Sequence, residues 1–241
     1  ESTQTLYYQA AATPQTRQGY MLSLKKGTPV RLTDGEGTHD LFFSDNYRQM
    51  IDNYRSVSQP NTYTLYTLSK DGSKRKVKVL EDNADVAKDW AALGIPEKNF
   101  FSFTTERSDL LNGWLLLPKD FDKTKKYPVL MIQYSGPQSQ RVLDLWHKRW
   151  EYYLAHEGYI VACVDGRGTD CRGRAFRNAS YMQLGQVEAQ DQISAARYLQ
   201  SLPYVNADRL CLCGWSYGGF QTLTTMSRPD SPFRCGIAIA P

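Results

Sequence analysis

Four short apolar runs in the second part of the chain constrain its fold more than any other feature. They are PVLMIQ at 128–133, YIVACV at 159–164, RLCLC at 209–213 and CGIAIA at 235–240. Between them the sequence predicts helices at 142–156, 186–202 and 219–226. Nearly continuous apolar strands that alternate with helices are typical of a parallel sheet covered on both faces. The pattern therefore predicts an α/β fold, preceded by a strand pair at 100–105 and 114–117.

The first part of the chain has a different pattern, with short strands rich in Tyr, Thr, Val and Leu between turn residues. We expect these strands at 6–10, 20–24, 40–43, 48–54, 62–68 and 77–80. A four-stranded propeller blade takes about 40–45 residues, so this segment holds roughly two blades. A propeller needs at least about four blades to close its ring. We therefore expect the segment to be the end of a larger all-β domain.

The change of pattern predicts a domain boundary between residues 82 and 83. A short helix is expected at 84–93, with Asn83 as its N-cap and Gly94 as its stop. The chain opens at Glu1 without an initiator Met or an apolar leader, so we expect a processed or excised piece.

Composition excludes several classes of protein. Hydrophobic residues make up 41% and charged residues 22%, which excludes wholesale disorder. No apolar run approaches the roughly 18 residues of a membrane span. The net charge is +4, and its two basic clusters, at 74–76 and 123–126, resemble solvated turns rather than a nucleic-acid-binding face.

The five cysteines do not indicate a metal site. Cys211 and Cys213 form a C-x-C pair with no histidine nearby, which makes a zinc site improbable. Cys163 and Cys235 also lie in apolar runs, where a free cysteine is expected to be a small buried hydrophobe.

The strongest chemical signal is GWSYGG at 214–219, which matches the G-x-S-x-G pattern of a nucleophile elbow. An apolar strand leads directly into it and a helical pattern follows. Glycines allow the close backbone approach that a sharp strand-to-helix turn requires. The sequence predicts Ser216 as a nucleophile, with the Tyr217 N–H donating to the oxyanion at the helix N-terminus. A Gly-rich phosphate loop is the alternative, but no G-K-[ST] follows.

Two other loops follow predicted strands. QYSGP at 133–137 corresponds to the loop that supplies the second oxyanion donor in such folds, and the Tyr134 hydroxyl could donate there. The alternative is a packed loop tyrosine. DGRG at 165–168 is a tight turn, in which an ion pair or loop anchor is favoured for Arg167 over substrate contact.

A general base for Ser216 is not evident in the sequence. Hydrolases of this type order their triad as Ser, acid, His, yet no histidine follows Ser216. His39 is expected on a turn or strand, and His147 and His156 on the helix at 142–156. Asp230 follows Ser216 too soon to be the acid. The sequence therefore carries a nucleophile and most of an oxyanion hole without its own general base.

Together these motifs resemble the dipeptidyl peptidase IV branch of the prolyl oligopeptidase family. YTLYTL at 63–68 and VLEDN at 79–83 resemble the last propeller blade and its exit, and YPVL, YSGP and DGRG follow in family order. The Trp before Ser216 is typical of this branch in particular. The resemblance implies that 1–82 is the C-terminal part of a β-propeller. It implies that 83–241 is the N-terminal part of an α/β-hydrolase catalytic domain, truncated after Pro241, and that the triad Asp and His lie beyond that residue.

The resemblance also implies a function. Such a protein is expected to be a serine exopeptidase that releases N-terminal dipeptides or tripeptides after Pro or Ala. Ser216 would form the acyl-enzyme, and Tyr134 and Tyr217 would hold the oxyanion, with no metal or organic cofactor. The expected partners are peptide substrates and a second copy of the whole protein, and a periplasmic, cell-surface or secreted location is favoured. The isolated 241-residue chain is expected to be inactive.

Two alternatives to this function remain open. An acylaminoacyl peptidase or esterase of the same fold would keep the nucleophile and change the substrate. A non-catalytic interaction module would retain the elbow as a relict.

Overall fold

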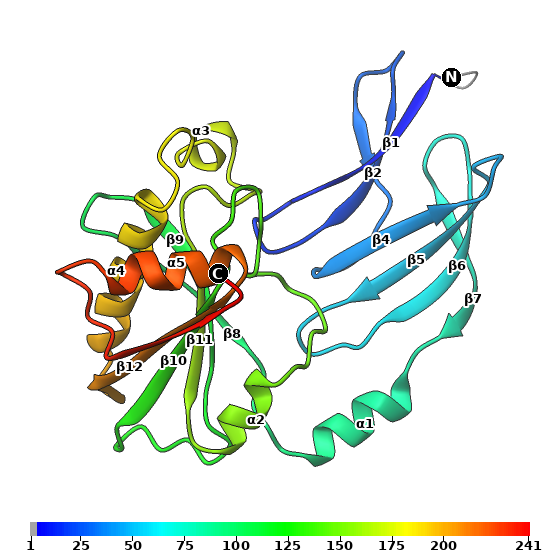
Figure 1. The fold of residues 1–241 in the computed structure, drawn as a ribbon. Helices are drawn as coiled ribbons and strands as arrows, with labels where there is room; N and C mark the ends of the chain where they lie inside the picture. Colours follow the sequence, from blue (N-terminus) through cyan, green and yellow to red (C-terminus); the bar gives the residue numbers. More distant parts are fainter. Residues whose placement is uncertain (1–3) are drawn as a thin grey trace. The chain divides into compact units, whose positions relative to one another are not determined.

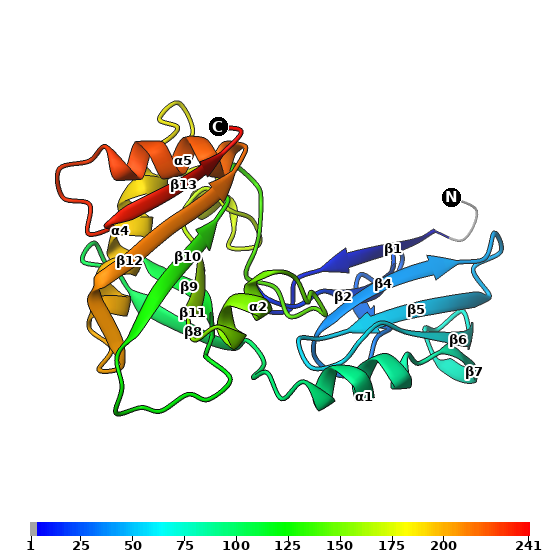
Figure 2. The same cartoon turned by 60° about the horizontal axis from the view of Figure 1, so that its bottom comes forward.

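The computed structural model describes residues 4–241, which form two compact units (Figures 1 and 2). One unit comprises Glu1–Leu93 together with Leu143–His147, and the other comprises Gly94–Val142 and Lys148–Pro241. The first is made of antiparallel sheets and the second of a mixed, largely parallel sheet with helices. This architecture confirms the predicted fold class.

The first unit holds two antiparallel sheets joined by short turns. The three-stranded sheet has the order β1 (Thr5–Ala10), β2 (Gln18–Ser23) and β3 (Pro29–Arg31). The four-stranded sheet is a meander of β4 (Thr38–Phe43), β5 (Gln49–Arg55), β6 (Thr62–Leu68) and β7 (Lys74–Glu81). No strand was predicted at β3, because its three residues are all exposed and show no apolar–polar alternation.

The core of this unit is small and depends on large side chains. Met21, Leu32, Met50 and Leu68 are buried against one another, and Tyr7 and Phe43 pack at the edge. Met21, Met50 and Leu68 come from β2, β5 and β6, and Leu32 directly follows β3. The cluster at 74–76 begins β7 rather than lying in a turn, because these three residues pair with Tyr66–Leu68 of β6, and Lys74 also pairs with Asp34 at 2.9 Å.

A short helix, α1 (Ala84–Ala92), ends the first unit. Gly94 follows it with φ +63°, the left-handed conformation expected of a helix stop. Asn83 occupies the N-cap position but does not cap the helix, contrary to expectation. Its side chain donates to the Asn61 carbonyl at 2.6 Å, and the Asp82 carboxylate accepts from the Ala84 N–H instead.

The second unit is built on a six-stranded sheet with the order β13-β12-β10-β11-β9-β8. Its strands are β8 (Asn99–Thr104), β9 (Leu110–Leu116), β10 (Tyr127–Gln133), β11 (Ile160–Asp165), β12 (Val205–Trp215) and β13 (Cys235–Ile239). The last four are parallel, while β8 and β9 form an antiparallel pair. The four apolar runs of the sequence are therefore the four parallel strands, whose carboxyl ends share one edge.

Four helices accompany this sheet: α2 (Glu151–His156), α3 (Arg174–Arg177), α4 (Val187–Gln200) and α5 (Tyr217–Met226). Figure 2 shows α4 and α5 beside the parallel strands. Leu199 of α4 packs with Leu210 and Leu212 of β12 in the main core, and all three are at most 1% exposed. Apolar burial of this kind contributes roughly 25 cal/mol per Å².

The helix expected at 142–156 is wrong over most of its length. Residues 142–150 form no helix, and α2 covers the last six residues of that range. The backbone groups of Asp144 bond elsewhere, because its N–H donates to the Gln15 carbonyl and its carbonyl accepts from the Thr38 hydroxyl. These long-range bonds replace the local bonds of a helix. His147 therefore lies on an irregular segment, contrary to expectation.

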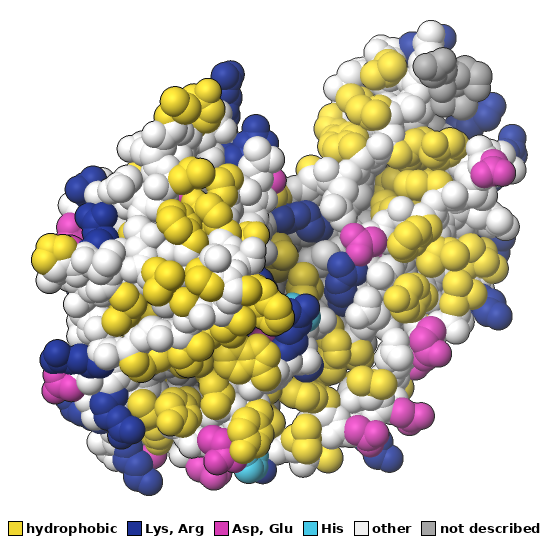
Figure 3. Space-filling model, in the orientation of Figure 1, with side chains coloured by type: hydrophobic (Ala, Val, Ile, Leu, Met, Phe, Trp, Pro, Cys, Tyr) yellow, Lys and Arg dark blue, Asp and Glu magenta, His cyan; other side chains and the backbone are white. Residues whose placement is uncertain are grey.

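The face of the sheet at β13 carries exposed apolar side chains. Figure 3 shows hydrophobic side chains gathered over the region of β12 and β13. Ile237 is 48% exposed, and Cys235 is exposed rather than buried as expected. Cys163 and Cys213 are buried as expected.

Candidate active site

Ser216 stands at the turn between β12 and α5, where the carboxyl edge of the parallel sheet meets a helix N-terminus. Its backbone has φ 56° and ψ −122°, a region that L-residues rarely adopt. Such strain costs about 1–3 kcal/mol and persists where the surroundings impose it. Here the Ser216 N–H donates to the Ile239 carbonyl at 2.9 Å, and its own carbonyl accepts from the Phe220 N–H at 3.0 Å. The residue is exposed, so its hydroxyl is accessible.

The glycines around Ser216 are required by the crowding of the backbone. A Cβ at Gly214 would lie 2.2 Å from the Gly218 oxygen, and one at Gly218 would lie 2.6 Å from the Gln133 oxygen. A Cβ at Gly219 would lie 2.9 Å from the Ile239 oxygen. No side chain fits at these distances. The G-x-S-x-G-G pattern is therefore a direct consequence of a turn packed between β10 and β13.

Tyr217 begins α5, so its N–H is among the first-turn donors that have no partner within the helix. The helix dipole adds partial positive charge at this end. The Tyr217 ring lies 6.1 Å from the Tyr134 ring, centroid to centroid, at 48°. The two tyrosines predicted from separate motifs are thus neighbours beside Ser216.

Tyr134 follows β10 directly, on the strand next to β12. Strand register pairs Gln133 with Gly214, which brings the two loops together at one sheet edge. The Tyr134 ring folds over its own loop, because a Cβ at Gly136 would lie 2.5 Å from the Tyr134 Cε1. The Arg141 guanidinium lies 5.5 Å from the centre of this ring. Such a cation–π contact restricts the ring.

The loop that carries Tyr134 is anchored from below by α4. Ser135 has φ 57° and is 3% exposed, and its hydroxyl oxygen accepts from the Gln192 Nε2 at 3.2 Å. The same amide donates to the Val164 carbonyl at 3.0 Å. Gln192 therefore links the ends of β10 and β11.

Arg167 is a loop anchor, as favoured from the sequence. Its guanidinium pairs with Asp191 of α4 at 2.7 Å and with Asp109 at 3.1 Å. The Asp191 carboxylate also accepts from the Arg167 N–H at 2.6 Å. Burial is the main cause that raises the pKa of Asp191, and the bonds to Arg167 oppose it. At the other end of this turn, Asp165 accepts from the Val142 N–H at 2.7 Å.

His156, the histidine of the second unit, does not lie near Ser216. It is the last residue of α2, just before β11 begins, whereas Ser216 follows the end of β12. Because β11 and β12 run in the same direction, His156 lies at the amino-terminal end of these strands and Ser216 at their carboxyl end. Figure 1 shows α2 and α5 at these opposite ends of the strands. His156 is exposed and pairs with Glu157 at 3.5 Å.

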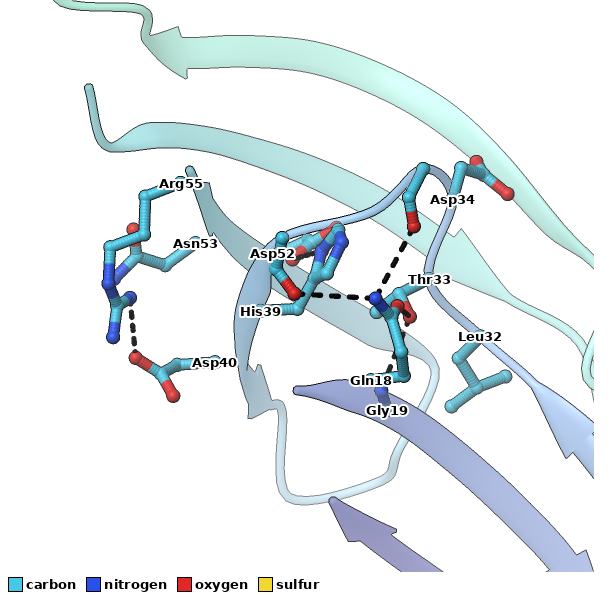
Figure 4. Close-up of polar contacts among 12 residues, drawn as sticks. Gln18, Gly19, Leu32, Thr33, Asp34, His39, Asp40, Asp52, Asn53 and Arg55 are labelled. Atoms are coloured by element: carbon cyan, nitrogen blue, oxygen red, sulfur yellow. Dashed lines mark hydrogen bonds and ion pairs between the residues drawn. The ribbon is translucent and has the colours of Figure 1, made fainter. Parts of the chain in front are cut away.

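His39 is a core residue of the first unit, on β4 as expected for a strand residue. It is 1% exposed, and its Nδ1 lies 2.9 Å from the Asp52 carboxylate (Figure 4). Gln18 and Thr33 bond to each other in the same region. The contact at Nδ1 offsets part of the cost of burying the ring, about 1–3 kcal/mol for an unpaired polar group, while His39 Nε2 has no hydrogen-bond partner within residues 4–241. We assign His39 to the packing of this sheet pair.

Sequence reasoning gave no role to the buried polar face of α4. Glu188, Asp191 and Gln192 are each at most 1% exposed, although they are polar and lie on a helix beside the buried Ala189 and Ile193. Polar residues at i, i+3 and i+4 lie side by side on a helix. That spacing beneath a predicted elbow is the signal that could have found them.

No group of three or more His, Cys, Asp or Glu side chains within residues 4–241 is arranged to hold a metal ion. None of the helices described is both long and apolar enough to cross a membrane.

Comparison with known families matches both parts of the chain. The dipeptidyl peptidase IV N-terminal region matches residues 1–61, and the prolyl oligopeptidase family matches residues 146–241. The chain is 33% identical to bovine dipeptidyl peptidase 4 over 95% of its own length and 30% of the relative. It is 35% identical to a probable dipeptidyl-aminopeptidase B of Metarhizium robertsii, covering 98% of the chain and 26% of the relative.

Solved structures agree with these matches. The crystal structure of Porphyromonas gingivalis dipeptidyl peptidase 4 superposes with a TM-score of 0.93 at 43% identity, covering 99% of this chain and 33% of that one. The chain spans about a third of the length of the relatives it matches. The matched families agree with the sequence motifs and with the fold of the elbow. The chain belongs to the dipeptidyl peptidase IV branch of the prolyl oligopeptidase family of serine peptidases.

Proposed function

We propose that the protein carrying these residues is a serine exopeptidase that releases N-terminal dipeptides, or tripeptides, after Pro or Ala. The observation that carries the proposal is the backbone of Ser216, held at φ 56° between β12 and α5 with its side chain exposed. Strain of this kind clusters at functional sites. The relatives named dipeptidyl peptidase 4 and dipeptidyl-aminopeptidase B support the substrate class.

In the proposed reaction, the Ser216 Oγ attacks the carbonyl carbon of the scissile peptide bond. The hydroxyl proton passes to a general base, which then protonates the leaving amine. The C–N bond breaks, the amine departs and an ester to Ser216 remains. Water hydrolyses this ester in the second half of the reaction. We place the base and its acid in the part of the relatives that this chain does not span.

The negative charge of the intermediate requires donors that are already in place. We assign this role to the Tyr217 N–H at the start of α5 and to the Tyr134 hydroxyl. The packing of Tyr134 between Gly136 and Arg141 supports the assignment, because it limits the reorganisation needed in the transition state. Losing one oxyanion donor costs about a hundredfold to a thousandfold in kcat.

We extend the proposal to the domains, with 1–82 as the end of a β-propeller and 83–241 as the first part of an α/β-hydrolase domain. The four-stranded meander β4 to β7 has the strand number of one blade. The carboxyl edge of the parallel strands, where Tyr134 and Ser216 follow β10 and β12, is the edge at which such sheets carry their chemistry.

The test is turnover of reporter peptides by the full-length natural protein and by two variants. Ser216→Ala should abolish release of an Xaa-Pro dipeptide, while Ser227→Ala, an exposed serine at the far end of α5, should retain wild-type rates. Preference for an acetyl-alanyl reporter over Xaa-Pro would replace the exopeptidase with an acylaminoacyl peptidase. Wild-type turnover by Ser216→Ala would overturn the assignment of the nucleophile.

A further inference from the structure

A buried carboxylate lies beneath the residue that follows Ser216. Glu188 of α4 is 0% exposed, and its Oε1 accepts a hydrogen bond from the Tyr217 hydroxyl at 2.9 Å. Its Oε2 is buried and has no hydrogen-bond partner within residues 4–241. Burial first, and the Glu188 carboxylate next, raise the pKa of Tyr217 to about 12. The tyrosine is therefore the proton donor in this bond.

This arrangement differs from that of two other buried carboxylates of the same unit. Glu151 pairs with the Lys98 ammonium at 2.9 Å, and Asp191 pairs with the Arg167 guanidinium at 2.7 Å. The direct partner of Glu188 is instead a neutral hydroxyl. A charge buried without a cation in contact costs free energy. Buried groups that lower the stability of the fold in this way are expected at functional sites.

The bond fixes the ring of Tyr217 against two other rings. The Phe220 ring packs edge-on against the Tyr217 ring, with ring centres 5.3 Å apart and an angle of 64° between the planes. The centre of the Tyr134 ring lies 6.1 Å from that of Tyr217. A ring held at its hydroxyl end cannot turn about its Cα–Cβ bond without breaking the bond to Glu188. The same residue carries the peptide N–H beside Ser216, so anchoring the ring also anchors that N–H.

We propose that Glu188 is a positioning residue for acylation, which acts through the Tyr217 hydroxyl to hold the Tyr217 ring and the Ser216–Tyr217 peptide in their reactive geometry. The inference rests on the proposed function of Ser216. Glu188 contacts Tyr217 rather than the reacting atoms, and its effect is expected on the rate of acylation rather than on the protonation of the nucleophile.

The test compares four variants of the full-length protein by the rate at which Ser216 is acylated under single-turnover conditions, per labelled active site. Glu188→Ala should slow acylation about tenfold to a hundredfold, because small displacements of reacting groups have effects of this size. Glu188→Gln keeps an acceptor for the hydroxyl and should stay within about threefold of wild type. Tyr217→Phe removes the donor and should match Glu188→Ala.

The double variant Glu188→Ala with Tyr217→Phe distinguishes positioning from general stability. If Glu188 acts through the hydroxyl, the double variant is no slower than either single variant, since both remove the same interaction. Multiplying effects would overturn the proposal. Full acylation rates in both Glu188→Ala and Tyr217→Phe would also overturn it, while leaving the role of Ser216 intact.

Glu151→Gln is the matched control, because it alters a buried carboxylate of the same unit on α2, whose partner is Lys98. It should lower thermal stability without changing the acylation rate per labelled site. If wild-type Ser216 takes up no acyl group, the proposed function itself fails, and this outcome is seen before any variant is measured.

Discussion

The Gly218 carbonyl lies so close to Gly214 that a Cβ at Gly214 would stand 2.2 Å from its oxygen. The last residues of β12 and the first turn of α5 are therefore in direct backbone contact, with Ser216 between them. This contact leaves Ser216 no room to relax to an ordinary conformation. The turn is held by packing on both sides rather than by the serine.

Gly214→Ala should therefore destabilise the second unit by about 3 kcal/mol or more, because neither backbone segment can move without disturbing the sheet. Gly158→Ala is the control, since Gly158 has φ +87° but nothing within 4 Å of an added Cβ. It should cost about 1 kcal/mol from backbone strain alone. Chemical denaturation measures both, and equal losses would contradict the crowding argument.

Removing one partner of the Lys98–Glu151 pair should lower the free energy of unfolding strongly, whereas replacing both partners by apolar residues should lower it little. Its side chains are 7% and 4% exposed, and the Lys98 Nζ also lies 4.2 Å from the centre of the Trp114 ring. Lys98→Met should lower the free energy of unfolding by about 3–5 kcal/mol by leaving Glu151 uncompensated. Adding Glu151→Leu should restore most of this loss.

The exposed pair Arg234–Asp208 is the control for that prediction, with side chains 69% and 84% exposed. Arg234→Met should change stability by less than about 1 kcal/mol. A double variant at Lys98 and Glu151 that is less stable than Lys98→Met alone would contradict the account.

Asp144 should make the first unit less stable as pH rises. Burial chiefly, and the charge of Glu36, raise its pKa above the ordinary value of 3.8. The folded state therefore keeps the proton at pH values where the unfolded chain has lost it. Stability falls as pH rises from 3.8 through the raised pKa, and the cost persists at neutral pH. Asp144→Asn keeps an acceptor for the Val57 N–H, and should be more stable than wild type at pH 7 with a flatter acid profile.

Asp71 provides a control of opposite sign in the same unit. Hydrogen bonds from Ser73 lower the pKa of Asp71 in the folded state. Its contribution to folding stability is therefore present above the ordinary pKa of 3.8 and is lost as pH falls through the folded-state pKa. Asp71→Asn should not raise stability at neutral pH. An Asp144→Asn protein that is weaker at pH 7 and keeps the wild-type profile would refute the assignment.

Cysteine alkylation should distinguish the two ends of the parallel sheet. Cys163 is 1% exposed, and burial raises the pKa of its thiol well above the usual range. Cys235 is exposed on β13. Iodoacetamide should modify Cys163 at least about a hundredfold more slowly than Cys235 in the native chain, and both equally after unfolding. Mass mapping of the labelled peptides measures the two rates.

The sequence predicts the surroundings of Ser216 well because their signals are local. An apolar strand, a glycine-rich turn and a helix follow one another within 205–226. Tyr134 could be placed for the same reason, since it follows a strand whose neighbour was predictable. The roles of Glu188 and Gln192 were not predictable in this way, because their partners lie far away in the chain. Tyr217 is 29 residues from Glu188, and Ser135 is 57 residues from Gln192.

The helix expected at 142–156 failed for a related reason. Its residues have an acceptable helical pattern, but the backbone of Asp144 bonds to Gln15 and Thr38, more than a hundred residues earlier. Local propensity is a weak constraint when tertiary bonds satisfy the same backbone groups. Asn83 does not cap α1 for the same reason, because its side-chain amide donates to the Asn61 carbonyl instead.

Labelling with a fluorophosphonate tests whether Ser216 is a nucleophile that forms an acyl-enzyme. The full-length protein is treated with the reagent, its intact mass is determined and the modified peptide is mapped. We expect a single adduct on Ser216, and none in Ser216→Ala. An adduct at another serine, or no adduct on a protein that still releases Xaa-Pro dipeptides, would contradict it.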